Sequence, residues 1–251
     1  MHTAWWLAVP FLPLFPFSVL FVLLFKRLPG TWTRSLLLLI WPLAGILLLA
    51  GGNVEIPRWV LLWAVASALL YSFRALVIRE LNLWVSYIAV SAWSVLWVVL
   101  SSNSSYHLVV FALGFSLPMA LMVSLGGLLQ RRFSAAYAGL YGGIAQSHPR
   151  LSAMLVFTLL AVIATPVFPG FFTMMSSIMA QMLEQPLVAL GLLLVWLLWS
   201  WSGFLLLQGL VMGPVKPSTA LQPDLDTRET GAYGALLVGL VLFGLSMVEV
   251  F

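Results

Sequence analysis

Long apolar segments, separated by short polar stretches, run the whole length of the chain. Eight of them lie at 5–25, 35–50, 59–78, 81–100, 106–129, 151–168, 187–212 and 233–248. A bilayer core of about 30 Å needs about 20 helical residues, and these leucine-rich runs are continuous rather than alternating, which favours helices over a β-barrel. The pattern predicts an all-α polytopic membrane protein with about eight transmembrane helices. Only Arg79 and Glu80 separate the third and fourth segments, which predicts a tight helical hairpin.

Two ends of these segments carry further information. The first segment is followed by Lys26 and Arg27 instead of a small-residue cleavage site, so we interpret it as a retained helix. After the sixth segment, Pro166, Pro169 and Gly170 cannot continue a regular helix. The backbone groups that they free must be buried in protein or face a watery cavity. We therefore predict a broken helix with a half-helix at 171–182, as in many transporters, against the alternative of a plain turn outside the membrane.

Composition supports the membrane assignment. The 251 residues are 63% hydrophobic and only 7% charged, whereas a soluble domain carries roughly 25% charged residues. The excess apolar surface must face lipid, so the bilayer is the first expected partner. With so few charges, a nucleic-acid partner is not expected. The chain has no cysteine, which excludes disulfides and thiolate metal sites.

The basic residues predict an orientation. If the N-terminus lies outside, ten of the 11 basic residues fall in inside loops, and Arg58 alone falls outside. The ten are Lys26, Arg27, Arg34, Arg74, Arg79, Arg131, Arg132, Arg150, Lys216 and Arg228. Because Lys and Arg are concentrated in cytoplasmic loops, we expect a multi-pass protein of the cell inner membrane with both termini on the outer, periplasmic side.

The residues offer little for catalysis. No helix carries histidine and carboxylate at ligand spacing, and no nucleophile elbow is present, so we expect no enzyme, no cofactor and no metal site. Asp224 and Asp226 lack the spacing of a calcium loop and are interpreted as part of a solvated loop. His107, near the start of its segment, is the main candidate for carrying a proton. A histidine hydrogen-bonded at a helix end is the alternative.

Four stretches are similar to motifs of one known family. Residues 142–151 resemble a Gly-Gly-Leu-x-(Lys/Arg)-x-x-Pro loop before a helix, and 166–172 resemble a Pro-(Pro/Gly)-x-x-Gly-Phe-x-x-Lys break at the expected spacing. Residues 79–91 resemble an Asp-x-Lys-x-x-x-Ala-Tyr-Ser-x-x-Ser segment, and the start at Tyr106 and His107 resembles a His-Leu-x-x-His-x-x-x-Lys helix. These motifs belong to the antiporter-like proton-conducting membrane subunits of respiratory complex I, Mrp antiporters and DAB-type inorganic-carbon complexes.

The resemblance covers about residues 59–251 and implies the C-terminal half of the antiporter-like fold. It divides the chain into two N-terminal helices at 1–58 and an antiporter-like bundle at 59–251. Tyr87 and Ser91 match family positions and join His107 as ion-path candidates.

The chain departs from the family at the residues that move protons. Phe115 and Met174 stand where the family has lysines, and Phe111 stands where it has a second histidine. Apolar side chains cannot hold a proton. The resemblance thus predicts the fold, and the substitutions argue against the usual proton relay.

The leading hypothesis is a non-catalytic accessory subunit of an ion-coupled membrane complex, possibly one for inorganic-carbon accumulation. Its partners would be larger antiporter-like or catalytic subunits, contacted through glycine-rich stretches at 126–127 and 231–239. Two alternatives stay open. One is a working proton or cation path in a complex I-like or Mrp-like assembly, and the other is a bare membrane anchor for a peripheral enzyme.

Overall fold

A computed structural model describes residues 4–49, 56–102, 105–140, 143–214 and 222–250. These residues form a bundle of helices, and the one strand-like contact among them is an isolated bridge between Glu80 and Tyr137. The elements are η1 (Ala4–Leu7), α1 (Ser18–Arg27), α2 (Thr31–Leu49), α3 (Arg58–Ala75), α4 (Leu81–Ser102), α5 (Ser105–Phe133), α6 (Ile144–Ser147), α7 (Pro149–Val162), α8 (Pro169–Met182), α9 (Pro186–Val211), α11 (Thr227–Ser246) and η2 (Met247–Val250).

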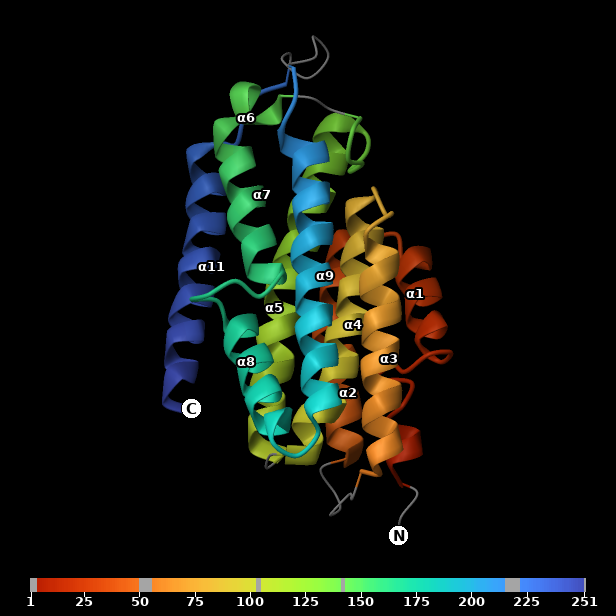
Figure 1. Cartoon of the computed structure of the whole chain (residues 1–251). Helices are drawn as coiled ribbons and strands as arrows, with labels where there is room; N and C mark the ends of the chain where they lie inside the picture. Colours follow the sequence, from red (N-terminus) through yellow and green to blue (C-terminus); the bar gives the residue numbers. More distant parts are fainter. Residues whose placement is uncertain (1–3, 50–55, 103–104, 141–142, 215–221, 251) are drawn as a thin grey trace.

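The helices run alternately up and down the long axis of the bundle (Figure 1). α2, α4, α5, α9 and α11 contain segments long and apolar enough to cross a membrane. α3 makes a further passage, and its 18 residues begin at Arg58 and end beyond Arg74. The multi-pass helical architecture predicted from the sequence is therefore confirmed.

α4 forms the centre of the molecule. From Trp84 to Val99 its side chains are buried, apart from a half-buried Tyr87. It packs against α1, α3, α5, α8 and α9. A helix that is apolar all round belongs in the interior of a bundle, which explains why this segment lacks an amphipathic pattern.

The first predicted helix is wrong over most of its length. Residues 8–17 form successive turns, and the regular helix starts only at Ser18. Pro10, Pro13 and Pro16 recur every third residue and remove the N–H groups that a helix would use. Hydropathy alone hid this break, because proline and its neighbours here keep the segment apolar.

The sixth predicted segment is corrected in a similar way. α7 ends at Val162, six residues before the predicted end, and α8 begins at Pro169. Figure 1 shows α7 and α8 as two halves of one passage, joined by an extended link at mid-height. The predicted half-helix is confirmed, and the break lies within the bundle instead of in a turn outside it. With α7 and α8 counted together, the passages number eight, beginning with residues 4–27.

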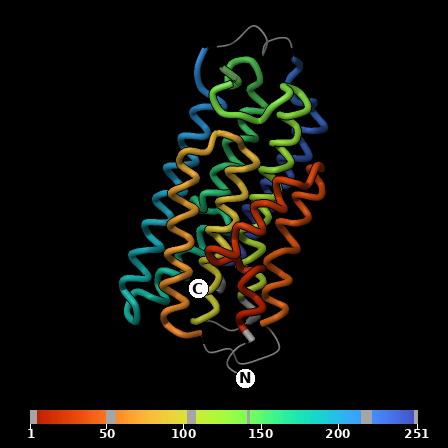
Figure 2. The backbone as a smooth tube through the Cα atoms, turned by 90° about the vertical axis from the view of Figure 1, so that its right-hand side faces the viewer, coloured from red at the N-terminus to blue at the C-terminus, as the bar shows by residue number. Residues whose placement is uncertain are grey.

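The basic residues are distributed unequally between the two ends of the bundle. Residues 4–7 and α11's end lie in the lower half of the view, and Figure 2 shows the same arrangement from the side. Nine basic residues lie toward the opposite, upper end, which we call the basic end: Lys26, Arg27, Arg34, Arg74, Arg79, Arg131, Arg132, Arg150 and Arg228. Arg58 starts α3 at the lower end, and Lys216 lies outside the described residues. The predicted segregation of basic residues is thus a feature of the structure.

The two glycine-rich stretches differ in their surroundings. Gly126 lies against Leu81 and Asn82 of α4, and Gly127 lies against Thr31 of α2. This pair therefore serves packing within the chain, not the partner contact that the sequence suggested. A Cβ added at Gly231, Gly234 or Gly239 would meet no atom within 4 Å.

Candidate functional site: the helix break and the polar cap

The link between α7 and α8 has a strained backbone. Ala164 and Val167 adopt left-handed conformations, with φ of 59° and 82°. Such values are rare for residues with a side chain, and rarest for a β-branched one such as Val167. Strain of this kind persists only where the surrounding structure fixes it.

Neighbouring side chains satisfy the backbone carbonyls that the break frees. The indole N–H of Trp196 on α9 lies 3.2 Å from both the Ile163 and the Ala164 carbonyl oxygens. The hydroxyl of Thr165 donates to the Leu160 carbonyl at 2.9 Å. The break is thus closed by protein groups, which answers the requirement that backbone at membrane depth be paired.

Aromatic side chains occupy the centre of the bundle beside the break. Phe115 of α5 and Trp199 of α9 are fully buried, and their ring centroids lie 5.7 Å apart in an edge-to-face arrangement. A Cβ at Gly170 would lie 3.6 Å from the Phe115 ring, so this ring sits directly against the start of α8. We call Phe115 and Trp199 the aromatic plug.

A short chain of hydrogen bonds links the aromatic plug to α3. The Trp199 indole N–H donates to the Ser91 hydroxyl oxygen at 2.9 Å. The hydroxyls of Ser91 and Ser72 lie 2.8 Å apart, and both contact the Ala68 carbonyl. This series of hydrogen bonds ends at a backbone carbonyl within α3.

The predicted site residues fall into separate places. Ser91 accepts a hydrogen bond from Trp199 of the aromatic plug. Pro169 and Gly170 are buried at the start of α8, whereas Pro166 is exposed. Tyr87 lies one turn before Ser91, and its ring centroid is 5.3 Å from that of Tyr71. His107 is in the first turn of α5, and Tyr87 is in the second turn of α4. These two turns lie toward opposite ends of the bundle (Figure 1). The His107 side chain lies outside the described residues.

The positions of the missing family lysines are apolar and buried. Met174 of α8 is fully buried, Phe115 is 2% exposed, and Phe111 is also buried. Among the side chains that the structure describes, no lysine, arginine, aspartate or glutamate is buried. The one buried histidine in that set is His148, which precedes α7 at the basic end.

Sequence reasoning missed a second break, formed by residues 8–17. Its freed carbonyls also accept hydrogen bonds from tryptophans: Trp41 donates to Pro10 at 3.1 Å, Trp97 to Leu12 at 2.9 Å and Trp63 to Phe15 at 2.7 Å. The hydroxyl of Ser94 donates to the Pro13 carbonyl. The signal in the sequence was the three-residue recurrence of proline.

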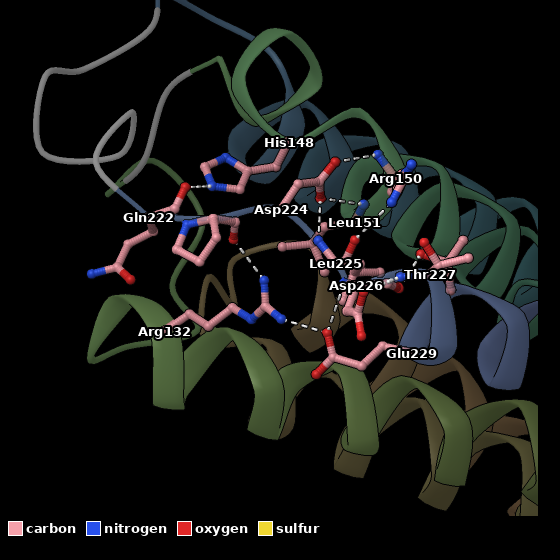
Figure 3. A network of polar contacts seen from close by, with 12 residues as sticks. Arg132, His148, Arg150, Leu151, Gln222, Asp224, Leu225, Asp226, Thr227 and Glu229 are labelled. Carbon is pink, nitrogen blue, oxygen red and sulfur yellow. Dashed lines mark hydrogen bonds and ion pairs between the residues drawn. The ribbon is translucent and has the colours of Figure 1, made fainter.

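A polar network closes the basic end (Figure 3). Arg132 of α5 pairs with Glu229 of α11 at 2.6 Å and donates to the Pro223 carbonyl. Asp226 and Glu229 form a reciprocal capping box at the start of α11. At the end of the predicted solvated loop, Asp226 is exposed as expected, and its carboxylate and that of Glu229 cap α11.

Asp224 caps α7. Its carboxylate accepts hydrogen bonds from the backbone N–H groups of Arg150 and Leu151 at 2.9 and 3.1 Å, and from that of Leu225. Partial burial acts to raise the pKa of this carboxyl, but the three backbone hydrogen bonds, aided by nearby His148, outweigh burial and hold the pKa below its ordinary value. An anion at a helix N-terminus is also favoured by the helix dipole.

His148 joins the same connection. Its Nε2 lies 2.8 Å from the Gln222 carbonyl oxygen, so Nε2 must carry a proton and donate. Its Nδ1 lies 2.8 Å from the Ser147 hydroxyl. With both nitrogens engaged and both aspartates capping helices, these groups make a structural clasp. The described residues contain no cluster of three metal-ligating side chains.

The architecture is similar to that of several solved structures. A chain of respiratory complex I from Thermus thermophilus, solved with bound NADH, matches with a TM-score of 0.83 at 18% identity, over 97% of this chain and 56% of that one. A chain of the Mrp complex from Dietzia sp. DQ12-45-1b matches with a TM-score of 0.83 at 13% identity, over 98% of this chain and 56% of that one. A chain of the membrane-bound sulfane sulfur reductase, an archaeal respiratory membrane complex, matches with a TM-score of 0.82 at 13% identity, over 96% and 51%.

No protein-family model and no curated protein sequence matches this chain. The chain spans about half the length of the structures that it resembles. At such low identity the likeness establishes the fold, and it agrees with the motifs around the break. The chain therefore has the fold of about half of an antiporter-like membrane subunit of the complex I and Mrp type.

Proposed function

We propose that this chain is a non-catalytic accessory subunit of an ion-coupled membrane complex. It would contribute an antiporter-like helical frame, packed against larger antiporter-like or catalytic subunits, without carrying protons through its own centre. The solved structures that it resembles are chains of larger membrane complexes, which supports a partnership of this kind.

One observation carries the proposal. The positions at which the family resemblance expects lysines hold the buried, apolar Phe115 and Met174. A proton path through the membrane needs groups that accept and release protons, and charged residues at that depth are retained only for function. Phe115 fills the space beside the break with a ring that can do neither.

A reconstitution experiment tests the proposal. The full chain, purified and placed in liposomes, should leave an imposed pH gradient no more leaky than empty liposomes, as read by an internal pH dye. In the native host, affinity purification of the tagged chain should recover a full-length antiporter-like protein. The inorganic-carbon complex is the assembly that we favour, and the proteins recovered would distinguish it from a complex I-like or Mrp-like one.

Two results would overturn the accessory role. If the chain alone collapses the gradient and His107→Ala stops the leak, the chain is itself an ion path. If no antiporter-like protein is recovered and a peripheral enzyme is found instead, the chain is a membrane anchor. An unrelated helical protein of similar size, reconstituted in parallel, controls for non-specific leak.

We further propose that the basic end faces the cytoplasm of the inner membrane and that both termini face the periplasm. The segregation of nine described basic residues toward one end supports this orientation.

A further inference from the structure

A groove runs along the surface of the bundle between α2 and α11, with α5 as its floor. Its volume is about 700 Å³. Its walls are apolar over most of their length, formed by Leu39 of α2, Leu117 and Leu121 of α5, and Leu236 and Phe243 of α11. None of these residues belongs to the break or to the polar network at the basic end.

Polar groups gather at the end of the groove that lies nearest the basic end. They are Thr31 and Ser35 in the first two turns of α2, Arg131 in the last turn of α5, and Tyr233 in the second turn of α11. The groove therefore has a polar, cationic mouth and an apolar body. This is the complement of an amphiphile with an anionic head and hydrocarbon chains.

Arg131 differs from the arginines around it. Arg132 pairs with Glu229, and Arg34 donates to the Leu28 carbonyl at 2.9 Å. The side chain of Arg131 is exposed, and its guanidinium forms no hydrogen bond or ion pair with any residue that the structure describes. Its positive charge is thus available to a ligand at the level where lipid headgroups lie.

The length of the groove indicates which amphiphile fits. Leu117 and Arg131 are 14 residues apart on α5, or about 21 Å along the helix, and Tyr233 and Phe243 are about 15 Å apart on α11. One leaflet contributes about 15 Å of the 30 Å hydrocarbon core. A groove of this length suits one lipid of a single leaflet, whereas a membrane-spanning helix of a partner would need about twice as much.

We propose that this groove binds an anionic phospholipid, with its phosphate at Arg131 and its acyl chains between α2 and α11. The proposal does not depend on the role of the chain in a complex. It also gives a reason for the open space beside Gly239, which lines the groove and where a Cβ would meet no atom within 4 Å.

Native mass spectrometry of the full, delipidated chain in detergent tests the site, with phosphatidylglycerol and phosphatidylcholine as probes. We expect one phosphatidylglycerol to be retained in preference to phosphatidylcholine. Arg131→Gln should weaken phosphatidylglycerol retention about fivefold and leave phosphatidylcholine unchanged, the factor typical of one interfacial cation. Gly239→Phe should block retention of the tight lipid, because Gly239 lines the groove and a ring there would occupy its space.

Matched controls use the same substitutions away from the groove. Arg58→Gln removes an arginine at the other end of the bundle, and Gly234→Phe adds a ring on a face of α11 that does not line the groove. Both should retain lipid as the unchanged protein does. Equal retention of the two lipids, or normal retention in both Arg131→Gln and Gly239→Phe, would overturn the proposal. If the unchanged protein forms a dimer in detergent that Gly239→Phe abolishes, with no change in lipid retention, the groove belongs to a second copy and the proposal is overturned as well.

Discussion

At the scale of single residues, the described side chains show a contrast between a bundle centre without buried charge and ends that carry the charged groups. The aromatic plug fills the space beside the break, and the indole of Trp199 donates to Ser91. Among the described side chains, the carboxylates lie at the polar ends, where Asp224 and Asp226 cap α7 and α11. Among the described residues, the interior is packed with apolar side chains, and its hydrogen bonds come from uncharged groups.

Replacing Trp199 by phenylalanine tests how much the plug stabilises the bundle. Trp199→Phe removes a buried hydrogen bond and part of a ring, so we expect a loss of about 1 kcal/mol from the hydrogen bond and more from the lost volume. The measurement is the thermal midpoint in detergent, compared at one scan rate. Trp201→Phe, on an exposed side chain two residues away, is the control and should leave the midpoint unchanged. Equal midpoints for both variants would show that the plug does not stabilise the fold.

The Asp224 cap predicts a dependence on pH. Folding lowers the pKa of this carboxyl. The carboxylate therefore stabilises the protein at pH values above 3.8, the ordinary pKa of the group, and this stabilisation is lost as the pH falls through the lower pKa of the folded state. At pH 7, Asp224→Asn should reduce stability by about 0.5–2 kcal/mol, as for other helix caps. The deficit should shrink as the pH falls below 3.8 in thermal scans across pH. Exposed Glu184→Gln is the control, and a deficit that stays constant with pH would contradict the prediction.

At the scale of elements, two interrupted passages set this bundle apart from a row of plain helices. Both breaks have their carbonyls covered by tryptophans from neighbouring helices: Trp196 at the link between α7 and α8, and Trp41, Trp63 and Trp97 at residues 8–17. α11 covers the first of these breaks closely. The Gly244 position is in contact with the Val167 carbonyl and with the backbone of Phe168 and Pro169.

This close approach makes Gly244 sensitive to substitution. Gly244→Leu would place its side chain where the backbone of the break lies, so we expect α11 to separate from α7 and α8 and the fold to become less stable by several kcal/mol. Limited proteolysis of α11 and the thermal midpoint in detergent both measure this. Gly234→Leu, on the same helix and away from the groove, is the control and should behave as the unchanged protein, since a Cβ at Gly234 meets no atom within 4 Å. Resistance of α11 to protease in both variants would count against the contact.

The sequence predicted the elements unevenly, for reasons that lie in particular residues. Long apolar runs located α2, α4, α5, α9 and α11, and Pro166, Pro169 and Gly170 located the break before α8. Hydropathy failed at residues 8–17, because Pro10, Pro13 and Pro16 interrupt the helix without making the segment polar. For the aromatic plug, the sequence showed only that Phe115 stands where the related family has a lysine. That Phe115 meets Trp199 depends on tertiary packing, because α4 and α8 each pack against both α5 and α9, and no local sequence pattern records this.

At the scale of the whole molecule, the eight passages return the chain to the side on which it starts, and the basic residues gather toward the other. This arrangement agrees with the fold shared with chains of complex I and the Mrp complex. Chemical labelling can test the proposed orientation of the chain in the membrane.

Because the chain has no cysteine, single cysteines report its orientation without background. Gln146→Cys marks the basic end and Glu184→Cys marks the turn between α8 and α9 at the other end; both positions are exposed. An impermeant maleimide should label Glu184→Cys in cells whose outer membrane alone is permeabilised. It should label Gln146→Cys only after the inner membrane is opened. The reverse pattern, or equal labelling in intact spheroplasts, would contradict the proposed orientation.

The broken passages also bear on how the protein enters the membrane during synthesis. α7 and α8 have 14 residues each, too few to cross a bilayer singly, and the tryptophan that closes their junction comes from α9, which is made later. Residues 8–17 likewise wait for Trp41, Trp63 and Trp97 on later helices. Each interrupted segment must therefore stay near the insertion machinery, or in contact with water, until its downstream helix arrives. We therefore expect maturation of this protein to depend on tryptophans of later helices. Truncation before α9 would leave the break between α7 and α8 with two unpaired carbonyls inside the lipid, those of Ile163 and Ala164.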